Sequence, residues 1–323
     1  MLKDKEFYTE IGLLTGVVGE RIDKDGILRS CMFKSRNKIS HHGEIYIPKY
    51  ESGDVRTRYR DAVSFYKSGK LKSLYLNERQ EIDCPVGKMK AEFVSFYESG
   101  RYLRIFPVYG QINGYWSERE EAELLTSYSI EIGEQKIEAK ISCIVFYESG
   151  AVKSLTLWPG ENVDIKTPYS KIKVRFGISF YESGAVESIE PENPVHLTYD
   201  ACSFFAYDNH PLGIHGEKNS LSFYENGTLK ALKTTITAVV LTSEKEEIRI
   251  APEQKISQTD IDAMEVYPIN IEFLNQSVRI TDSSGYIHEY SLLQFKMGTE
   301  QVIENLYQKC GDCSNCSKCS TGI

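Results

Sequence analysis

The amino-acid sequence predicts an all-β fold, built as an array of antiparallel β-hairpins with a short C-terminal helix and a cysteine-rich tail. Three observations favour this fold class. An eleven-residue phrase, written SFYESGAVESI in one copy, occurs five times in similar form. Polar and apolar residues alternate after each copy, as they do in half-buried strands. The chain also holds 21 tyrosines, and aromatic residues favour strands.

Each copy of the phrase is predicted to form one hairpin. Aromatic and β-branched residues lead into Glu-Ser-Gly or a close variant, and alternating residues follow. This is a three-residue loop, in which two residues form a type I turn and the glycine takes the left-handed position of a bulge. The structural turn glycines are Gly53, Gly69, Gly100, Gly150, Gly184 and Gly227. Two degenerate copies carry Gly26 and Gly285.

A Phe-Tyr pair precedes the turn in the clear copies. Neighbouring residues of a strand point to opposite faces, so one ring should pack in the core and the other should lie on the outer face. An outer row of tyrosines would suit a protein or peptide partner, because tyrosine gives contact area at low entropy cost. The alternative is that both rings are buried between layers. The candidate binding-face tyrosines are Tyr66, Tyr97, Tyr147, Tyr181 and Tyr224.

The repeated unit is longer than the phrase. Residues 71–100 align with residues 152–184, and each stretch holds a Lys-Ser-Leu-x-Leu strand, a polar loop and a further strand. The spacing between phrases is uneven, and insertions fall around residues 111–138 and 191–218. Insertions in repeat arrays project from one face and often carry the binding surface. We therefore expect function in the insertions.

The phrases SFYKSGKLKSL and SFYENGTLKAL resemble the bacterial variant of the MORN repeat, whose core reads roughly Tyr-Tyr-x-Asn-Gly-x-Leu-Lys. The unit here is longer than the family's usual spacing, and the Tyr-x-Gly pattern of eukaryotic MORN repeats is absent. The resemblance implies a MORN-like meander or solenoid with a protein-interaction or lipid-adjacent role, and some members of the family are described as antitoxins. It implies no catalysis by the repeat.

The chain is predicted to divide into four parts. They are N-terminal cap strands at 1–45, the hairpin array at 46–232, a degenerate β continuation at 233–298, and a helix with the cysteine tail at 299–323. Thr299 can cap the helix, and an apolar stripe that includes Val302 and Leu306 follows it.

The strongest chemical signal is the tail KCGDCSNCSKCS, which places four cysteines at three-residue intervals. Thiolates bind zinc and iron–sulfur clusters, but the spacing departs from the usual template for each of them. A disulfide or redox role and a flexible thiol tail are the other interpretations. The candidate metal ligands are Cys310, Cys313, Cys316 and Cys319.

Four other cysteines, Cys31, Cys84, Cys143 and Cys202, are scattered singly and are expected to be buried. A further group, Asp208, His210 and His215, lies in one insertion and could form a metal or acid–base site, although a polar loop is the simpler account.

Composition narrows the class of protein. The formal net charge is −8, which argues against a nucleic-acid platform held by phosphate contacts. The sequence contains no run of about 18 apolar residues that could span a membrane, and no signal peptide is visible. We therefore expect a cytoplasmic protein. We therefore expect a non-catalytic scaffold that binds a protein partner. The alternative is metal handling or redox chemistry on the cysteine tail, and an enzyme using the Asp208 insertion is a weaker third possibility.

Overall fold

The computed structural model describes residues 5–50, 53, 55–57, 60–209, 211, 219–257 and 263–302. The chain forms two compact units. Unit 1 comprises residues 1–192, 212–219 and 225–227, and unit 2 comprises residues 193–211, 220–224 and 228–323. The described residues form 28 strands and one short helix, so the predicted all-β class is confirmed. The four-part division expected from the sequence stays a prediction.

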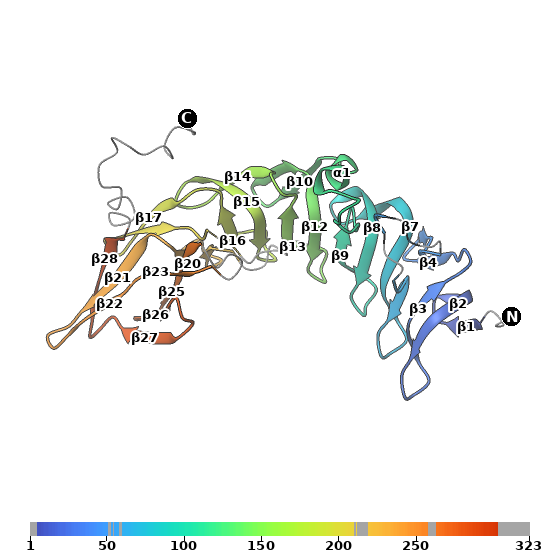
Figure 1. Ribbon diagram of the computed structural model, residues 1–323, viewed down its shortest axis with the longest axis horizontal. Coiled ribbons are helices and arrows are strands. Elements are labelled where there is room, and N and C mark those ends of the chain that lie inside the picture. The colour runs from blue at the N-terminus through green and yellow to red at the C-terminus, as the bar shows by residue number, and fades with distance from the viewer. Residues whose placement is uncertain are drawn as a thin grey trace. The chain divides into compact units, whose positions relative to one another are not determined.

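Unit 1 is built on an antiparallel sheet of consecutive hairpins, here called the front sheet. Each strand pairs with the next along the sheet. Figure 1 shows these hairpins side by side, with their phrase turns along the lower edge of the view. The strands are β1 (Lys5–Thr9), β2 (Gly12–Ile22), β3 (Leu28–Phe33), β6 (Val63–Phe65), β7 (Leu71–Cys84), β8 (Gly87–Phe96), β9 (Tyr102–Phe106), β12 (Ile141–Phe146), β13 (Val152–Leu157), β15 (Lys171–Phe180) and β16 (Val186–Pro191).

The phrase turns have the predicted geometry. In one copy the Gly150 amide donates to the Tyr147 carbonyl (3.0 Å), and the Tyr147 amide donates to the Ala151 carbonyl (2.8 Å). The turn glycines of the five clear copies have φ between 82° and 99°. A type I turn followed by a glycine bulge has this pattern. Gly53 adjoins residues outside the described part, so its turn stays a prediction.

The two degenerate copies form the same local turn, with Asp in place of Tyr. Asp23 and Asp282 accept backbone amide hydrogens with their own carboxylates, from Ile27 (2.9 Å) and Tyr286 (3.0 Å). The second of these turns joins β26 (Ser277–Thr281) to β27 (Ile287–Ser291). It lies at the strand end opposite the phrase turn of the same sheet. A shorter turn between β25 (Ile269–Leu274) and β26 occupies the phrase position.

A second layer of short hairpins covers the core face of the front sheet. β7 and β8 pair over two stretches, and between them residues 76–79 face Glu92 alone. β15 likewise faces residues 157–161 with Phe176, whose φ is 57°. These irregularities bend the long hairpins, whose distal halves return over the core face. The other second-layer strands of unit 1 are β4 (Ile39–His41), β5 (Glu44–Tyr46), β10 (Tyr128–Ile132), β11 (Gln135–Ala139) and β14 (Asn162–Lys166).

The core of unit 1 lies between these layers. The phrase phenylalanines are buried, as are Ile82 and Met89 of the bent hairpin. Tyr46 of the second layer packs edge-on against Phe96, with ring centroids 6.1 Å apart. The tyrosine after each phrase phenylalanine is partly exposed. The predicted burial of one ring of each Phe-Tyr pair is therefore confirmed, and the outer face expected for the other ring stays a prediction.

The turns of the second layer rest on the phrase turns. The His41 ring bonds the Gly100 carbonyl through Nε2 (3.0 Å). A Cβ atom on Gly150 would lie 3.6 Å from Pro85, and one on Gly184 would lie 3.1 Å from the backbone nitrogen of Gly133. The glycines thus serve two purposes, the positive φ of the turn and the close approach of a second turn.

Unit 2 follows a similar plan. Its main sheet orders the strands β19, β20, β25, β26 and β27, and β21 lies between β22 and β28 in a smaller one. Phe204 of the hairpin β17–β18 packs on Phe273 with centroids 5.4 Å apart. The remaining strands are β17 (Val195–Tyr199), β18 (Cys202–Ala206), β19 (Leu221–Phe223), β20 (Leu229–Thr234), β21 (Thr237–Thr242), β22 (Glu247–Ile250), β23 (Glu253–Ile256), β24 (Met264–Tyr267) and β28 (Lys296–Gln301).

The expected start of the C-terminal helix is wrong. Thr299 and Glu300 lie in β28, where Thr299 pairs with Val239. Pairing with a buried strand outweighs the local capping signal here. The remainder of the expected helix lies outside the described residues. The structure instead has a helix α1 (Glu118–Glu123), which begins at a capping box of Ser117 and Glu120.

Two matched glycine substitutions separate the two purposes of the phrase glycine. Gly69 and Gly184 both have φ of 85°, but a Cβ on Gly69 meets no atom within 4 Å. Gly69→Ala should lower the free energy of unfolding by about 1–2 kcal/mol through backbone strain alone. Gly184→Ala should cost a further ~1–3 kcal/mol, because the Gly133 backbone must move. Urea unfolding of both variants measures the difference, and equal losses would contradict the contact.

Candidate functional site

The phrase tyrosines tie consecutive hairpins together. The Tyr66 hydroxyl donates to the Phe96 carbonyl (2.7 Å), and Tyr97 donates to Phe146 (2.8 Å). The same bond recurs from Tyr147 to Phe180 (2.9 Å) and from Tyr224 to Phe273 (2.8 Å). Each acceptor is a backbone carbonyl of the neighbouring hairpin. Four of the five tyrosines predicted to form a binding face therefore use their hydroxyls for bonds between hairpins.

The environment keeps these phenols in their donor form. Burial raises the pKa of Tyr66 and Tyr147, and nearby glutamates add to the effect. Both hydroxyls therefore stay protonated near neutral pH and keep donating. Tyr181 is also partly exposed. Recognition of a partner by the exposed edges of the five rings stays a prediction.

Removing one hydroxyl tests the tie. Tyr147→Phe keeps the ring and removes the bond to the Phe180 carbonyl, so the free energy of unfolding should fall by about 0.5–1.5 kcal/mol. Tyr8→Phe is the control, because Tyr8 is 86% exposed, and it should change nothing measurable. Chemical denaturation of both variants gives the comparison. A Tyr147→Phe variant as stable as the unmodified protein would exclude the tie.

An exposed apolar surface lies on one insertion. Ile112 and Tyr115 come from the loop after β9 and are 49% and 84% exposed, and Val55 is 57% exposed. The Asn113 side chain donates to the Val55 carbonyl (2.7 Å), so the two segments lie together. We call Val55, Ile112 and Tyr115 the insertion platform.

A buried ion-pair network holds the platform. Arg56 reaches Glu121 through Nε (2.6 Å) and Glu92 through Nη2 (2.7 Å). Both carboxylates are almost fully buried. Glu121 also accepts from the Trp116 indole (2.6 Å) and the Gly110 amide (2.9 Å). Insertion, strand β8 and the segment before β6 are thus joined at one point.

The network favours the charged state of its arginine. Burial by itself would lower the pKa of Arg56, but hydrogen bonds to Glu121 and Glu92 raise it above its usual value. A Cβ on Gly110 would lie 2.5 Å from the Glu121 carboxylate, so glycine is needed there. Because a buried pair is costly to break, the network fixes the loop that carries the platform.

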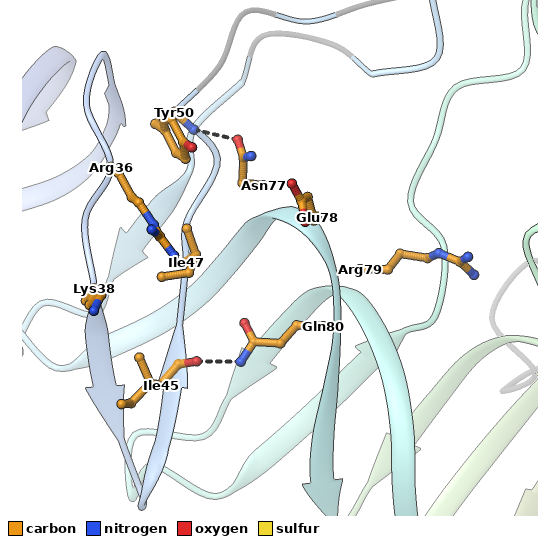
Figure 2. Close-up of a pocket in the computed structure, with 9 residues that line it drawn as sticks. All are labelled: Arg36, Lys38, Ile45, Ile47, Tyr50, Asn77, Glu78, Arg79 and Gln80. Carbon is orange, nitrogen blue, oxygen red and sulfur yellow. Dashed lines mark hydrogen bonds between the residues drawn. The ribbon is translucent and has the colours of Figure 1, made fainter.

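A groove with basic side chains lies between β5 and β7 (Figure 2). Its volume is about 530 Å³. Asn77 closes one end by accepting from the Tyr50 amide (3.3 Å), and the Gln80 side chain closes the other by donating to the Ile45 carbonyl. We call it the basic groove. Its lining residues are Arg36, Lys38, Ile45, Ile47, Tyr50, Asn77, Glu78, Arg79 and Gln80.

The charges of the basic groove are unevenly used. Arg79 points away from the other residues and donates to the Leu124 carbonyl. Arg36 and Lys38 are exposed, and neither has a hydrogen bond or ion pair of its side chain within the described part of the chain. Asn37 between them is buried and bonds the Thr15 amide (2.9 Å) and carbonyl (2.9 Å). The two cations are therefore mounted on an anchored segment.

The remaining candidates from the sequence are dispersed. Cys31, Cys143 and Cys202 are buried as expected, but Cys84 is partly exposed. Burial raises the pKa of the Cys84 thiol to about 11, so it is a thiol near neutral pH. Asp208 pairs with Lys233 (3.3 Å). His210, His215 and the tail ligands Cys310, Cys313, Cys316 and Cys319 lie outside the described residues.

Neither a metal-ligand cluster nor a membrane-spanning helix is present in the described ranges. They hold no group of three His, Cys, Asp or Glu side chains placed to bind a metal ion. They also hold no helix that is long and apolar enough to cross a membrane.

Comparison with known proteins gave no relative: no protein family matches the chain, and no curated protein or solved structure matches it. The resemblance to the MORN repeat stays a prediction.

Proposed function

We propose that this protein is a non-catalytic scaffold that binds a protein partner through its insertions. One observation carries the proposal. The insertion platform exposes two aliphatic side chains and a tyrosine on two adjoining segments that a buried ion-pair network holds in place. Exposed apolar groups on a rigid mount lose little entropy on binding, and tyrosine is favoured at interfaces.

The phrase repeats support the same division of roles. Their phenylalanines fill the core, four of their five turn glycines lie against a second-layer turn, and four of their tyrosine hydroxyls bond the next hairpin. Few groups of the phrase remain for a ligand. Loops placed by a rigid scaffold are the usual carriers of binding function.

Site-specific photo-crosslinking tests the platform. A photoreactive amino acid replaces Tyr115 in the full chain, expressed in cells of the source organism, and crosslinking is followed by mass spectrometry. The expected result is one discrete protein adduct. The same replacement of Tyr8 is the control, because Tyr8 and Tyr115 are exposed to nearly the same extent, 86% and 84%.

A second variant tests the chemistry of the contact. Ile112→Glu in the Tyr115 crosslinking protein should abolish the adduct without lowering stability, because Ile112 is half exposed. No adduct from Tyr115, or the same adducts from Tyr8, would refute the platform as a binding surface.

The cysteine tail supports a second proposal, that the protein handles metal or carries out redox chemistry with zinc or an iron–sulfur cluster held by the tail. Its support is the spacing of Cys310, Cys313, Cys316 and Cys319. Metal analysis after anaerobic purification should find bound zinc or iron in the full chain and lose it in a version ending at Lys309. A metal-free full chain would refute this second proposal and leave the scaffold proposal intact.

A further inference from the structure

We propose that the basic groove binds an acidic peptide in an extended conformation, with carboxylates two residues apart and an aliphatic side chain between them. The inference uses a site separate from the insertion platform, and it rests on the proposed function only in assuming a protein partner. Three observations support it: the contrast with a second groove of unit 1, the spacing of Arg36 and Lys38, and their positive charge.

Unit 1 has a second groove, which lies between β11 and β14 as the basic groove lies between β5 and β7. Gln135 of β11 bonds both the amide and the carbonyl of Lys166 in β14 (3.0 Å each), as Gln80 joins β7 to β5. This second groove, of about 340 Å³, lies beside that junction, and we call it the balanced groove. Its charged lining residues are Glu134, Lys136, Glu138, Asp164, Lys166 and Lys171.

The two grooves differ in chemistry, although each lies between a second-layer hairpin strand and a neighbouring strand. The balanced groove has three cations and three carboxylates, and Lys171 is paired with Asp164 (2.9 Å). The basic groove has three cations, of which Arg79 is turned away and bonds the Leu124 carbonyl, and one carboxylate, together with two isoleucines and a tyrosine. Ile45 in that lining is 56% exposed. The balanced groove shows that a groove between second-layer strands forms without an excess of cations.

The spacing of the free cations sets the ligand's geometry. Exposed and buried residues alternate from Arg36 through Asn37, Lys38 and Ile39. Arg36 and Lys38 therefore face the same side, about 6.6 Å apart along an extended chain. Carboxylates at positions i and i+2 of an extended peptide have the same spacing. Arginine binds carboxylates through paired hydrogen bonds, and the isoleucines offer contact to aliphatic side chains.

A protein segment fits the groove better than a nucleic acid. The chain has a formal net charge of −8, so a polyanion would meet general repulsion outside the groove. Two free cations bind few phosphates, but they suffice for two carboxylates. Exposed ion pairs are weak in salt, so the peptide's affinity should fall as ionic strength rises.

Fluorescence anisotropy with three probes tests the proposal on the full chain. The first probe is a labelled hexapeptide of alternating glutamate and valine, at about 50 mM salt, where exposed charge pairs are weakly screened. It should bind saturably. The second probe replaces each glutamate by lysine, and the third is a single-stranded oligothymidine, and neither should bind. Failure of the glutamate peptide to bind, or competition by the oligothymidine, would overturn the proposal.

Paired charge reversals locate the binding. Arg36→Glu with Lys38→Glu should weaken the glutamate peptide at least about tenfold. Lys136→Glu with Lys171→Glu in the balanced groove is the matched control and should leave the affinity unchanged. Equal effects from both pairs would overturn the site, since they would indicate binding to net charge alone. Loss of peptide binding leaves the Tyr115 adduct unaffected, so the two proposals fail separately.

Discussion

The bond from a tyrosine hydroxyl to the phenylalanine carbonyl of the next hairpin is the interaction on which this structure depends. It recurs at four phrase copies with lengths of 2.7–2.9 Å. A backbone carbonyl of a neighbouring hairpin is an acceptor that any sequence supplies, so the donor alone needs to be repeated. The phenylalanine beside each donor fills the core, and four of the five turn glycines lie against a second-layer turn. One phrase therefore positions both layers.

This arrangement limits where a ligand can bind. A change at a phrase phenylalanine, tyrosine or turn glycine loses core packing, the bond to the next hairpin or the turn geometry, so these residues have little freedom to acquire a new partner. The bends and insertions are different, because they interrupt the regular strand pairing while the strands stay paired on both sides of the interruption. The insertion platform and the basic groove both lie at such interruptions, one in the loop after β9 and the other beside the irregular stretch of β7. Exposed residues there can therefore be substituted with little loss in the free energy of unfolding of the array.

Local signals let the sequence predict the hairpins and their turns. The glycine bulge and the burial of phenylalanine depend on residues close together in the chain. The second layer could not be predicted in this way, because its bends arise where residues 76–79 face a single partner. The Arg56–Glu121 pair spans 65 positions, and the basic groove brings residues 36–50 together with residues 77–80. The capping box of α1 was a readable signal that was missed, whereas Thr299 carried a helix signal that strand pairing overrode.

We propose that the phrase builds the fold and that its interruptions bind a partner. The most direct measurement scores every single substitution in the phrase copies and in the insertion platform for two properties, unfolding free energy and the yield of the Tyr115 adduct. The account predicts that phrase substitutions lose adduct only in proportion to lost stability, and that platform substitutions lose adduct at unchanged stability. A substitution at an exposed phrase residue such as Ser183 that abolishes the adduct in a fully stable protein would contradict it.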